Sequence, residues 1–185
     1  MGTALCALVV YESMFGNTEQ VARAIAEGLA LDHVTVTVKE VGEAPVDAPL
    51  DVDLLVVGAP THAFSLSRPG TRADAVRQGA HESRQGRGLR EWLSAVSGPE
   101  RLGVAVFDTR VSKVRRLPAA AGPKAAKIAR QRGFTLLSKP VGFVVDDVKG
   151  PLGPHELERA AQWGRFVAGV ARIHVAAERA GSHLR

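Results

Sequence analysis

The sequence has a single cysteine and no long apolar run. With Cys6 alone, no disulfide can form within the chain, and its position in a short apolar stretch predicts a small buried side chain. The apolar runs are about as long as a strand, far short of the roughly 20 residues that a membrane-spanning helix needs. The first residues lack the basic segment, apolar stretch and cleavage site of a secretory signal. We therefore expect a cytoplasmic protein without a membrane span.

Several motifs of known chemistry are also missing. The sequence has no G-x-G-x-x-G for a dinucleotide and no G-x-x-x-x-G-K-[ST] for a nucleoside triphosphate. It has no G-x-S-x-G nucleophile elbow. The histidines are scattered, and no Cys/His cluster has the spacing of metal ligands, so we expect no metal site.

Acidic residues are absent from one long segment. The chain has 24 Lys and Arg against 19 Asp and Glu, a net charge of +5, yet residues 109–145 contain no Asp or Glu. That segment holds Arg110, Lys113, Arg115, Arg116, Lys124, Lys127, Arg130, Arg132 and Lys139. Because it has few aromatic residues and no recognised nucleic-acid motif, a solvated helix face is favoured over a nucleic-acid interface.

Strand and helix patterns alternate along the chain. Continuous apolar runs, typical of buried parallel strands, occur at 5–10, 54–58 and 102–107. Residues 34–38 alternate Val with Thr, as expected of an edge strand. A fifth strand over 134–145 is interrupted near Lys139-Pro140, or ends there and is followed by a short extension. The alternation predicts a single α/β domain over 1–185, with a mainly parallel sheet covered by helices on both faces.

Two segments depart from this alternation. Residues 66–88 contain five arginines and little apolar content, so we predict a long basic loop there; loops of this length are either functional or mobile. We expect the last residues, 177–185, to form a frayed tail.

The most informative stretch runs from Val9 to Ala22, where a buried strand ends in a loop that opens directly into a helix. The loop offers the hydroxyls of Ser13 and Thr18 and the amide of Asn17. Gly16 lets the backbone approach a ligand closely. Free N–H groups at a helix N-terminus favour an anion, so the loop predicts a phosphate site. A simpler interpretation stays open, in which Asn17 or Thr18 only caps the helix.

Two further loops follow strands that we expect beside the first. They are Pro60 to Ser65 and Asp108 to Val111. A doubly wound sheet of order 2-1-3-4-5 brings the ends of its first, third and fourth strands together at a switch point where ligands bind. The three loops therefore predict a ligand with a phosphate tail and a flat group.

At these loops the sequence resembles the flavodoxin family, which binds flavin mononucleotide (FMN). Ser13, Gly16, Thr18 and Glu19 match its first-loop signature, and residues 58–61 are similar to its second segment. The first loop also looks like the flavodoxin domains of diiron-fused flavoproteins and related flavin reductases. The resemblance implies a flavodoxin-like, five-stranded parallel sheet, noncovalent FMN, and electron exchange with a redox partner protein or a small-molecule acceptor. The cofactor-binding residues it implies are Ser13, Met14, Phe15, Gly16, Asn17, Thr18, Pro60, Thr61, His62, Ala63, Phe64, Asp108, Thr109 and Arg110.

The sequence departs from the family around the flavin ring. Flavodoxins commonly stack an aromatic residue on each face of the ring, whereas here only His62 and Phe64 are available. Arg110 either places a positive charge beside the ring or pairs with Asp108. Electron-carrier flavodoxins are usually strongly acidic, so this net positive chain either has an acidic partner or is not a diffusing carrier of that type.

Three functions therefore stay open. The first is an FMN-binding electron-transfer protein. The second is an enzyme, either an FMN-dependent NAD(P)H/quinone reductase or a flavodoxin-like oxidase, with residues 68–90 as a substrate lid or docking surface. The third is a flavin-free interaction domain. His62 and Asp108 are weak candidates for an acid/base pair, and we assign no catalytic residue.

Overall fold

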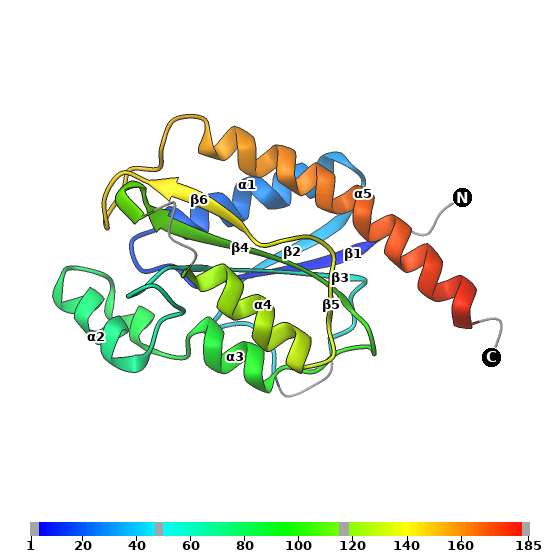
Figure 1. Ribbon diagram of the computed structural model, residues 1–185, viewed down its shortest axis with the longest axis horizontal. Coiled ribbons are helices and arrows are strands. Elements are labelled where there is room, and N and C mark those ends of the chain that lie inside the picture. Colours follow the sequence, from blue (N-terminus) through cyan, green and yellow to red (C-terminus); the bar gives the residue numbers. More distant parts are fainter. Residues whose placement is uncertain (1–3, 47–49, 115–118, 183–185) are drawn as a thin grey trace.

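The computed structural model describes residues 4–46, 50–114 and 119–182. Within them, strands and helices alternate and the strands form one parallel sheet (Figure 1). The strands are β1 (Cys6–Tyr11), β2 (Thr35–Glu40), β3 (Leu54–Pro60), β4 (Gly103–Val111), β5 (Thr135–Leu136) and β6 (Val141–Val145). The α-helices are α1 (Asn17–Leu31), α2 (Pro69–Arg77), α3 (Leu89–Ala95), α4 (Ala121–Gln131) and α5 (Glu156–Ser182), with 3-10 turns η1 (Glu82–Gln85) and η2 (Ser112–Val114).

The sheet has the predicted order. Neighbouring strands run β2-β1-β3-β4-β5, and β6 also pairs with β4. The fifth strand is thus in two pieces: Leu136 lies opposite Val104 near the start of β4, and Val141 lies opposite Phe107 further along. Between the pieces stands Pro140, whose ring nitrogen cannot donate to a ladder. The predicted interruption is confirmed, and β2 lies at the edge beside β1 as expected.

Helices cover both faces of the sheet, and each face has its own core. Helices α1 and α5 lie on one face (Figure 1). There the rings of Phe107, Phe143 and Trp163, the last from α5, meet edge to face with centroids 6.1 to 6.4 Å apart. On the other face, α3 and α4 enclose the buried side chains of Trp92 and Leu55. Both faces of the central strands are therefore covered, which explains their continuous apolar sequence.

The predicted basic loop over 66–88 is wrong, because the segment contains α2 and η1. The helix begins at Pro69, a residue well suited to a first helical position. Its described buried residues are Arg72 and Ala75, so it has no apolar stripe for sequence reading to detect.

Two other expectations are also corrected. The predicted frayed tail is helical as far as Ser182, where α5 ends, and residues 183–185 lie outside the described part of the chain. An ion pair of 3.3 Å between Arg179 and Asp53 connects this last part of α5 to the segment before β3. Cys6 is exposed rather than buried, because it is the first residue of β1 and precedes the covered part of the strand. Among the described helices, none is long and apolar enough to cross a membrane.

Glycines allow the backbones of α1 and α5 to approach closely. A Cβ at Gly164 of α5 would overlap the carbonyl oxygen of Ile25 in α1, whereas a Cβ at Gly169 would meet no atom within 4 Å. We predict that Gly164→Ala lowers the free energy of unfolding by about 1–3 kcal/mol, because the two helices must separate. Gly169→Ala is the matched control and should raise it by up to about 1 kcal/mol, since alanine is the better helix former. Urea denaturation measures both, and equal effects would contradict this packing.

Candidate functional site

The carboxyl ends of β1, β3 and β4 open into a cavity of about 270 Å³. The three loops that follow these strands all contribute to its wall, as the switch-point argument predicts. Most of the predicted site residues line it: Ser13, Met14, Phe15, Asn17, Thr18, Pro60, Thr61, His62, Ala63, Thr109 and Arg110. Gly16, Phe64 and Asp108 are the predicted residues that do not line the cavity.

The first loop presents an uncapped helix N-terminus to this cavity. Gly16, with a φ of 90°, turns the chain into α1, and its N–H donates to Ser13 Oγ at 3.1 Å. No side chain caps the helix, so the interpretation of Asn17 or Thr18 as a simple cap is wrong. The first N–H groups of a helix have no acceptor within the helix. They are therefore available to an anion in the cavity.

Two buried threonines join the first loop to the third. The hydroxyls of Thr18 and Thr109 lie 2.8 Å apart and share one hydrogen bond. Because each hydroxyl carries one proton, this contact leaves one O–H free to donate to a ligand. Together with the Asn17 amide and the Arg110 guanidinium, the wall offers several donors to a negatively charged group. Asp74 is the one carboxylate among its described lining residues.

Arg110 is held in place by a buried carboxylate. Its Nε and Nη2 donate to the two oxygens of Asp108 at 2.7 and 2.5 Å. Asp108 is fully buried and also accepts the N–H of Gly122, at 3.0 Å. The predicted pairing is therefore present, and Arg110 still reaches the cavity wall. Since both oxygens of Asp108 are engaged, His62 and Asp108 do not form an acid/base pair open to a substrate.

The second loop makes a tight turn at the edge of the cavity. His62 and Ser65 exchange two backbone hydrogen bonds of 2.8 and 3.0 Å around Ala63 and Phe64, whose φ angles are 45° and 62°. Positive φ is uncommon for residues other than glycine, and here it turns Phe64 outward, 50% exposed. His62 lines the cavity, and burial, followed by the charge of Arg72, lowers the pKa of its imidazole.

Sequence reasoning missed two parts of the cavity wall. One is the side of α2 that carries Thr71, Asp74 and Ala75, with Gln78 directly after the helix, in a segment predicted to be a loop. The other consists of Val145 at the end of β6 and Val148 in the segment that follows it. Pro69 was a usable signal for α2, whereas nothing in the sequence showed which way the helix would face.

Comparison with known proteins supports this geometry. Residues 9–69 match the family model described as flavodoxin. A flavodoxin from the domain Archaea superimposes with a TM-score of 0.66 and 21% identity, covering 91% of this chain and 99% of its own. The flavodoxin, WrbA-like protein of Agrobacterium tumefaciens superimposes with a TM-score of 0.59 and 22% identity, covering 92% of this chain and 99% of its own. Rubredoxin oxygen:oxidoreductase of Desulfovibrio gigas superimposes with a TM-score of 0.59 and 17% identity, covering 92% of this chain and 37% of that protein. Comparison with curated protein sequences finds no significant match.

The chain is flavodoxin-like. The predicted resemblance and fold class are confirmed by the matched segment and by the sheet order. At identities of this size the structural likeness shows the fold, and what the cavity binds has to be argued from its own residues.

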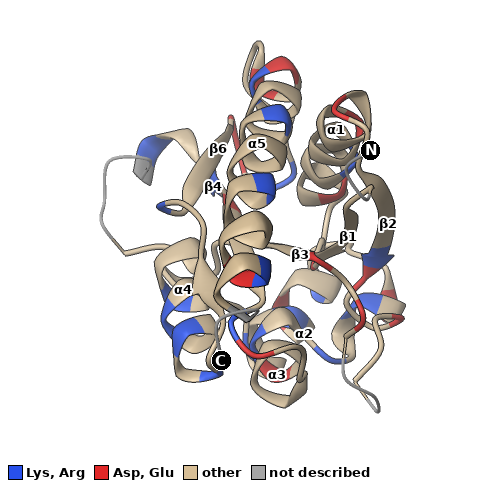
Figure 2. Ribbon diagram, turned by 90° about the vertical axis from the view of Figure 1, so that its right-hand side faces the viewer, with Lys and Arg blue, Asp and Glu red and all other residues tan. Residues whose placement is uncertain are grey.

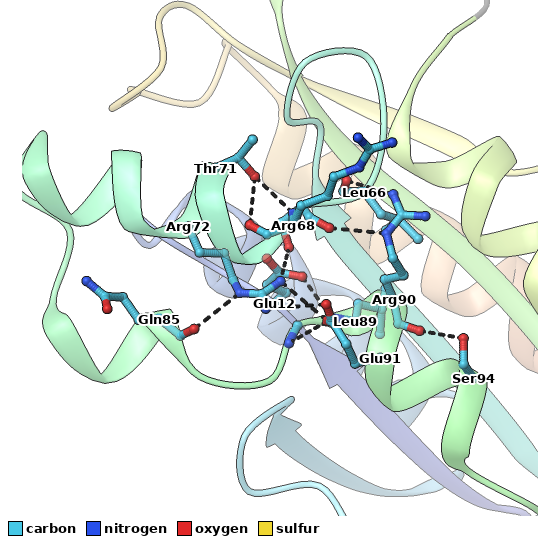
Figure 3. Close-up of polar contacts among 12 residues, drawn as sticks. Glu12, Leu66, Arg68, Thr71, Arg72, Gln85, Leu89, Arg90, Glu91 and Ser94 are labelled. Carbon is cyan, nitrogen blue, oxygen red and sulfur yellow. Dashed lines mark hydrogen bonds and ion pairs between the residues drawn. The ribbon is translucent and has the colours of Figure 1, made fainter.

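The flavodoxin-like protein uses a buried polar network to hold α2 beside the cavity (Figure 3). Arg72 of α2 is 3% exposed and donates to Ser67 Oγ at 2.9 Å and to Glu91 of α3 at 3.3 Å. The N–H of Leu89 donates to Glu12 Oε2 at 2.8 Å, and Glu12 directly precedes Ser13. The network therefore links α2 and α3 to the strand end that carries the first loop.

Other arginines of this segment are also engaged within the protein. Arg84 pairs with Glu19 at 3.4 Å, and Arg87 donates to the carbonyl of Ala44 at 2.8 Å. Arg90 donates to the carbonyl of Leu66 at 2.9 Å and to Ser65 Oγ at 3.1 Å. These contacts make them structural links between loops, which weakens the expectation that residues 68–90 form a docking surface.

The buried Glu12 makes the free energy of unfolding of the flavodoxin-like protein depend on pH. Its carboxyl is buried, its Oε1 has no hydrogen-bond partner among the described residues, and burial raises its pKa above the ordinary 4.5. A raised pKa stabilises the fold below pH 4.5, and this contribution is lost as pH rises through the folded pKa.

We therefore predict that Glu12→Gln gains stability relative to the parent as pH rises above 4.5. Glutamine keeps an acceptor for Leu89 N–H without a buried charge, and Arg72 keeps its partner Glu91. Urea denaturation of both proteins across this range measures the difference. A difference that does not change with pH would contradict the assignment to Glu12.

Proposed function

We propose that the protein binds FMN noncovalently and takes part in electron transfer. The observation that carries the proposal is the uncapped N-terminus of α1, which faces a cavity rich in donors at the switch point of the sheet. The flavodoxin match over residues 9–69 supports the same cofactor.

The cavity residues fit the two parts of FMN. Ser13, Asn17 and Thr18 would hold the phosphate, with hydroxyl, amide and helix N–H donors. Apolar side chains suited to a flat ring line the rest of the wall: Met14, Phe15, Ala75, Val111, Val145 and Val148. A ring bound here would lie mainly against aliphatic groups, with His62 beside it, in place of the paired aromatic residues common in the family.

The protein supplies binding, orientation and electrostatics, while FMN, when bound, supplies the redox chemistry. Asp108 balances the charge of Arg110, but the remaining N–H donors of the guanidinium would face the ring and favour the anionic reduced cofactor. His62 is neutral at pH 7, because burial lowers its pKa, and adds no second charge.

Electron transfer is favoured over a reductase or an oxidase of its own. Apart from His62, the described wall of the cavity offers a substrate no unengaged group for proton transfer. Both oxygens of Asp108 are bonded to Arg110 and Gly122, and Asp74 forms an ion pair with Arg77. An electron carrier needs no such group.

The phosphate contacts are tested by comparing FMN with riboflavin, which lacks the phosphate. We predict that the double variant Ser13→Ala/Thr18→Val binds FMN about 10- to 100-fold more weakly, since hydrogen bonds to charged groups contribute about 1.5–3 kcal/mol. Its affinity for riboflavin should stay within about twofold of the parent. Thr35→Val, on the exposed part of β2, is the control and should change neither. Fluorescence quenching measures each Kd, and equal losses for both flavins would contradict a phosphate site.

The role of Arg110 is tested by the reduction potential. We predict that Arg110→Gln lowers the two-electron potential of bound FMN by at least about 30 mV, which corresponds to about 1.4 kcal/mol. Because this variant leaves the buried Asp108 without its partner, the double variant Asp108→Asn/Arg110→Gln is measured beside it. Dye-coupled titration gives the potentials. An unchanged potential in both variants would contradict a guanidinium beside the ring.

A further inference from the structure

The net positive charge of this protein is confined to one segment. Residues 109–145 hold nine of the 24 Lys and Arg and no acidic residue. The rest of the chain therefore has 15 Lys and Arg against 19 Asp and Glu, a balance of −4. The molecule is thus acidic apart from one basic region, whose field can orient a charged partner.

Within the described residues, helix α4 carries the central part of this basic region. Lys124, Lys127 and Arg130 are exposed at three-residue spacing, and we call them the basic face of α4 (Figure 2). The opposite side of the helix, with Ala125, Ala126 and Ala129, is buried against the sheet.

The cations of the basic face have no counter-ion, in contrast to many of the described arginines. Within the described part of the chain, none of the three makes an ion pair. Elsewhere Arg23 pairs with Glu19 at 2.8 Å and Arg159 with Glu156 at 2.6 Å. Three exposed charges without partners repel one another, and an acidic surface would relieve this repulsion.

The basic face is joined directly to the candidate site. At the start of α4, the N–H of Ala121 donates to Thr61 Oγ1 at 3.1 Å, and the N–H of Gly122 donates to Asp108 at 3.0 Å. Thr61 lines the cavity, and Asp108 holds Arg110 against it. A partner on α4 would therefore sit next to the cavity.

We propose that the basic face of α4 docks an acidic protein that exchanges electrons with the cofactor in the cavity. This inference rests on the proposed function. Attraction between opposite charges speeds association while the complex stays short-lived, which suits a carrier that must bind and release quickly.

Other polyanionic partners fit this face less well. Single-stranded nucleic acids need aromatic platforms, but Phe134 and Phe143, the aromatic residues of the basic segment, are both buried. Duplex DNA is longer than one short helix, so it would also approach the rest of the chain, which has a net negative charge and would repel it. A membrane-binding helix needs exposed large apolar side chains, and the described residues of α4 include none.

The probe is an acidic [2Fe–2S] ferredoxin that is chemically reduced before mixing with the FMN-loaded protein. Each ferredoxin loses one electron and becomes oxidised, so two encounters reduce one FMN, and protons come from water. Stopped-flow absorption gives the second-order rate constant as a function of salt. We expect the rate constant to fall as salt rises, because screening shortens the range of attraction to about 10 Å at 0.1 M.

Two matched double variants locate the surface. Lys124→Glu/Lys127→Glu should lower the rate constant at least about tenfold at low salt, and this difference should shrink at high salt. Arg165→Glu/Arg172→Glu makes the same change of charge at exposed positions of α5, on the other face of the sheet, and should stay within about twofold of the parent. FMN affinity and reduction by dithionite should be unchanged in both.

Three outcomes would overturn the inference. The first is an equal loss in the two double variants, and the second is a rate constant that does not depend on salt. The third is duplex DNA that binds the basic face of α4 while the rate constant with ferredoxin is the same in the α4 variant as in the parent. If FMN itself does not bind, the proposed function fails, but docking can still be measured. In that case, oxidised ferredoxin should bind in a salt-sensitive way, and only the α4 variant should lose this binding. That result would support docking on the basic face of α4, whereas no salt-sensitive binding would refute it.

Discussion

The buried carboxylate of Asp108 connects the candidate site to helix α4. It fixes the guanidinium of Arg110 at the cavity wall and accepts an N–H from the first turn of α4. A buried carboxylate without such partners would be strongly destabilising, so the position of Arg110 and the start of α4 are set together. Gly122 permits the close approach, because a Cβ there would lie 2.5 Å from a carboxylate oxygen. One ion pair thus determines the position of Arg110 at the cavity wall and the place of the basic helix beside it.

The sheet could be predicted from the sequence because burial leaves a clear pattern. The continuous apolar runs of β1, β3 and β4 and the alternating β2 correspond to central and edge positions. The failures concern elements whose sequence does not reveal their packing. Helix α2 buries Arg72, a charged side chain that reads as solvent-exposed, because Ser67 and Glu91 satisfy it. At the other end of the chain, α5 continues past Ala177 although its sequence there looked frayed.

The first loop was the easiest part of the site to predict, because a strand, a glycine and a helix follow one another in sequence. The Thr18–Thr109 contact joins residues 91 positions apart, and only the strand order indicated that their loops would meet. The wall formed by α2 was out of reach, since neither its orientation nor the network of Glu12 leaves a sequence signal. The part of the candidate site formed by the first loop was therefore predicted from the sequence, while the part formed by α2 had to be read from the structure.

The central claim is that this cavity holds FMN. The most direct measurement is the visible absorption spectrum of the protein after incubation with FMN and removal of free cofactor by desalting. Flavin bands that stay with the protein, in a ratio close to one FMN per chain, are the predicted result. A protein that retains no flavin and does not quench FMN fluorescence on titration would contradict the claim and leave the fold with an interaction role.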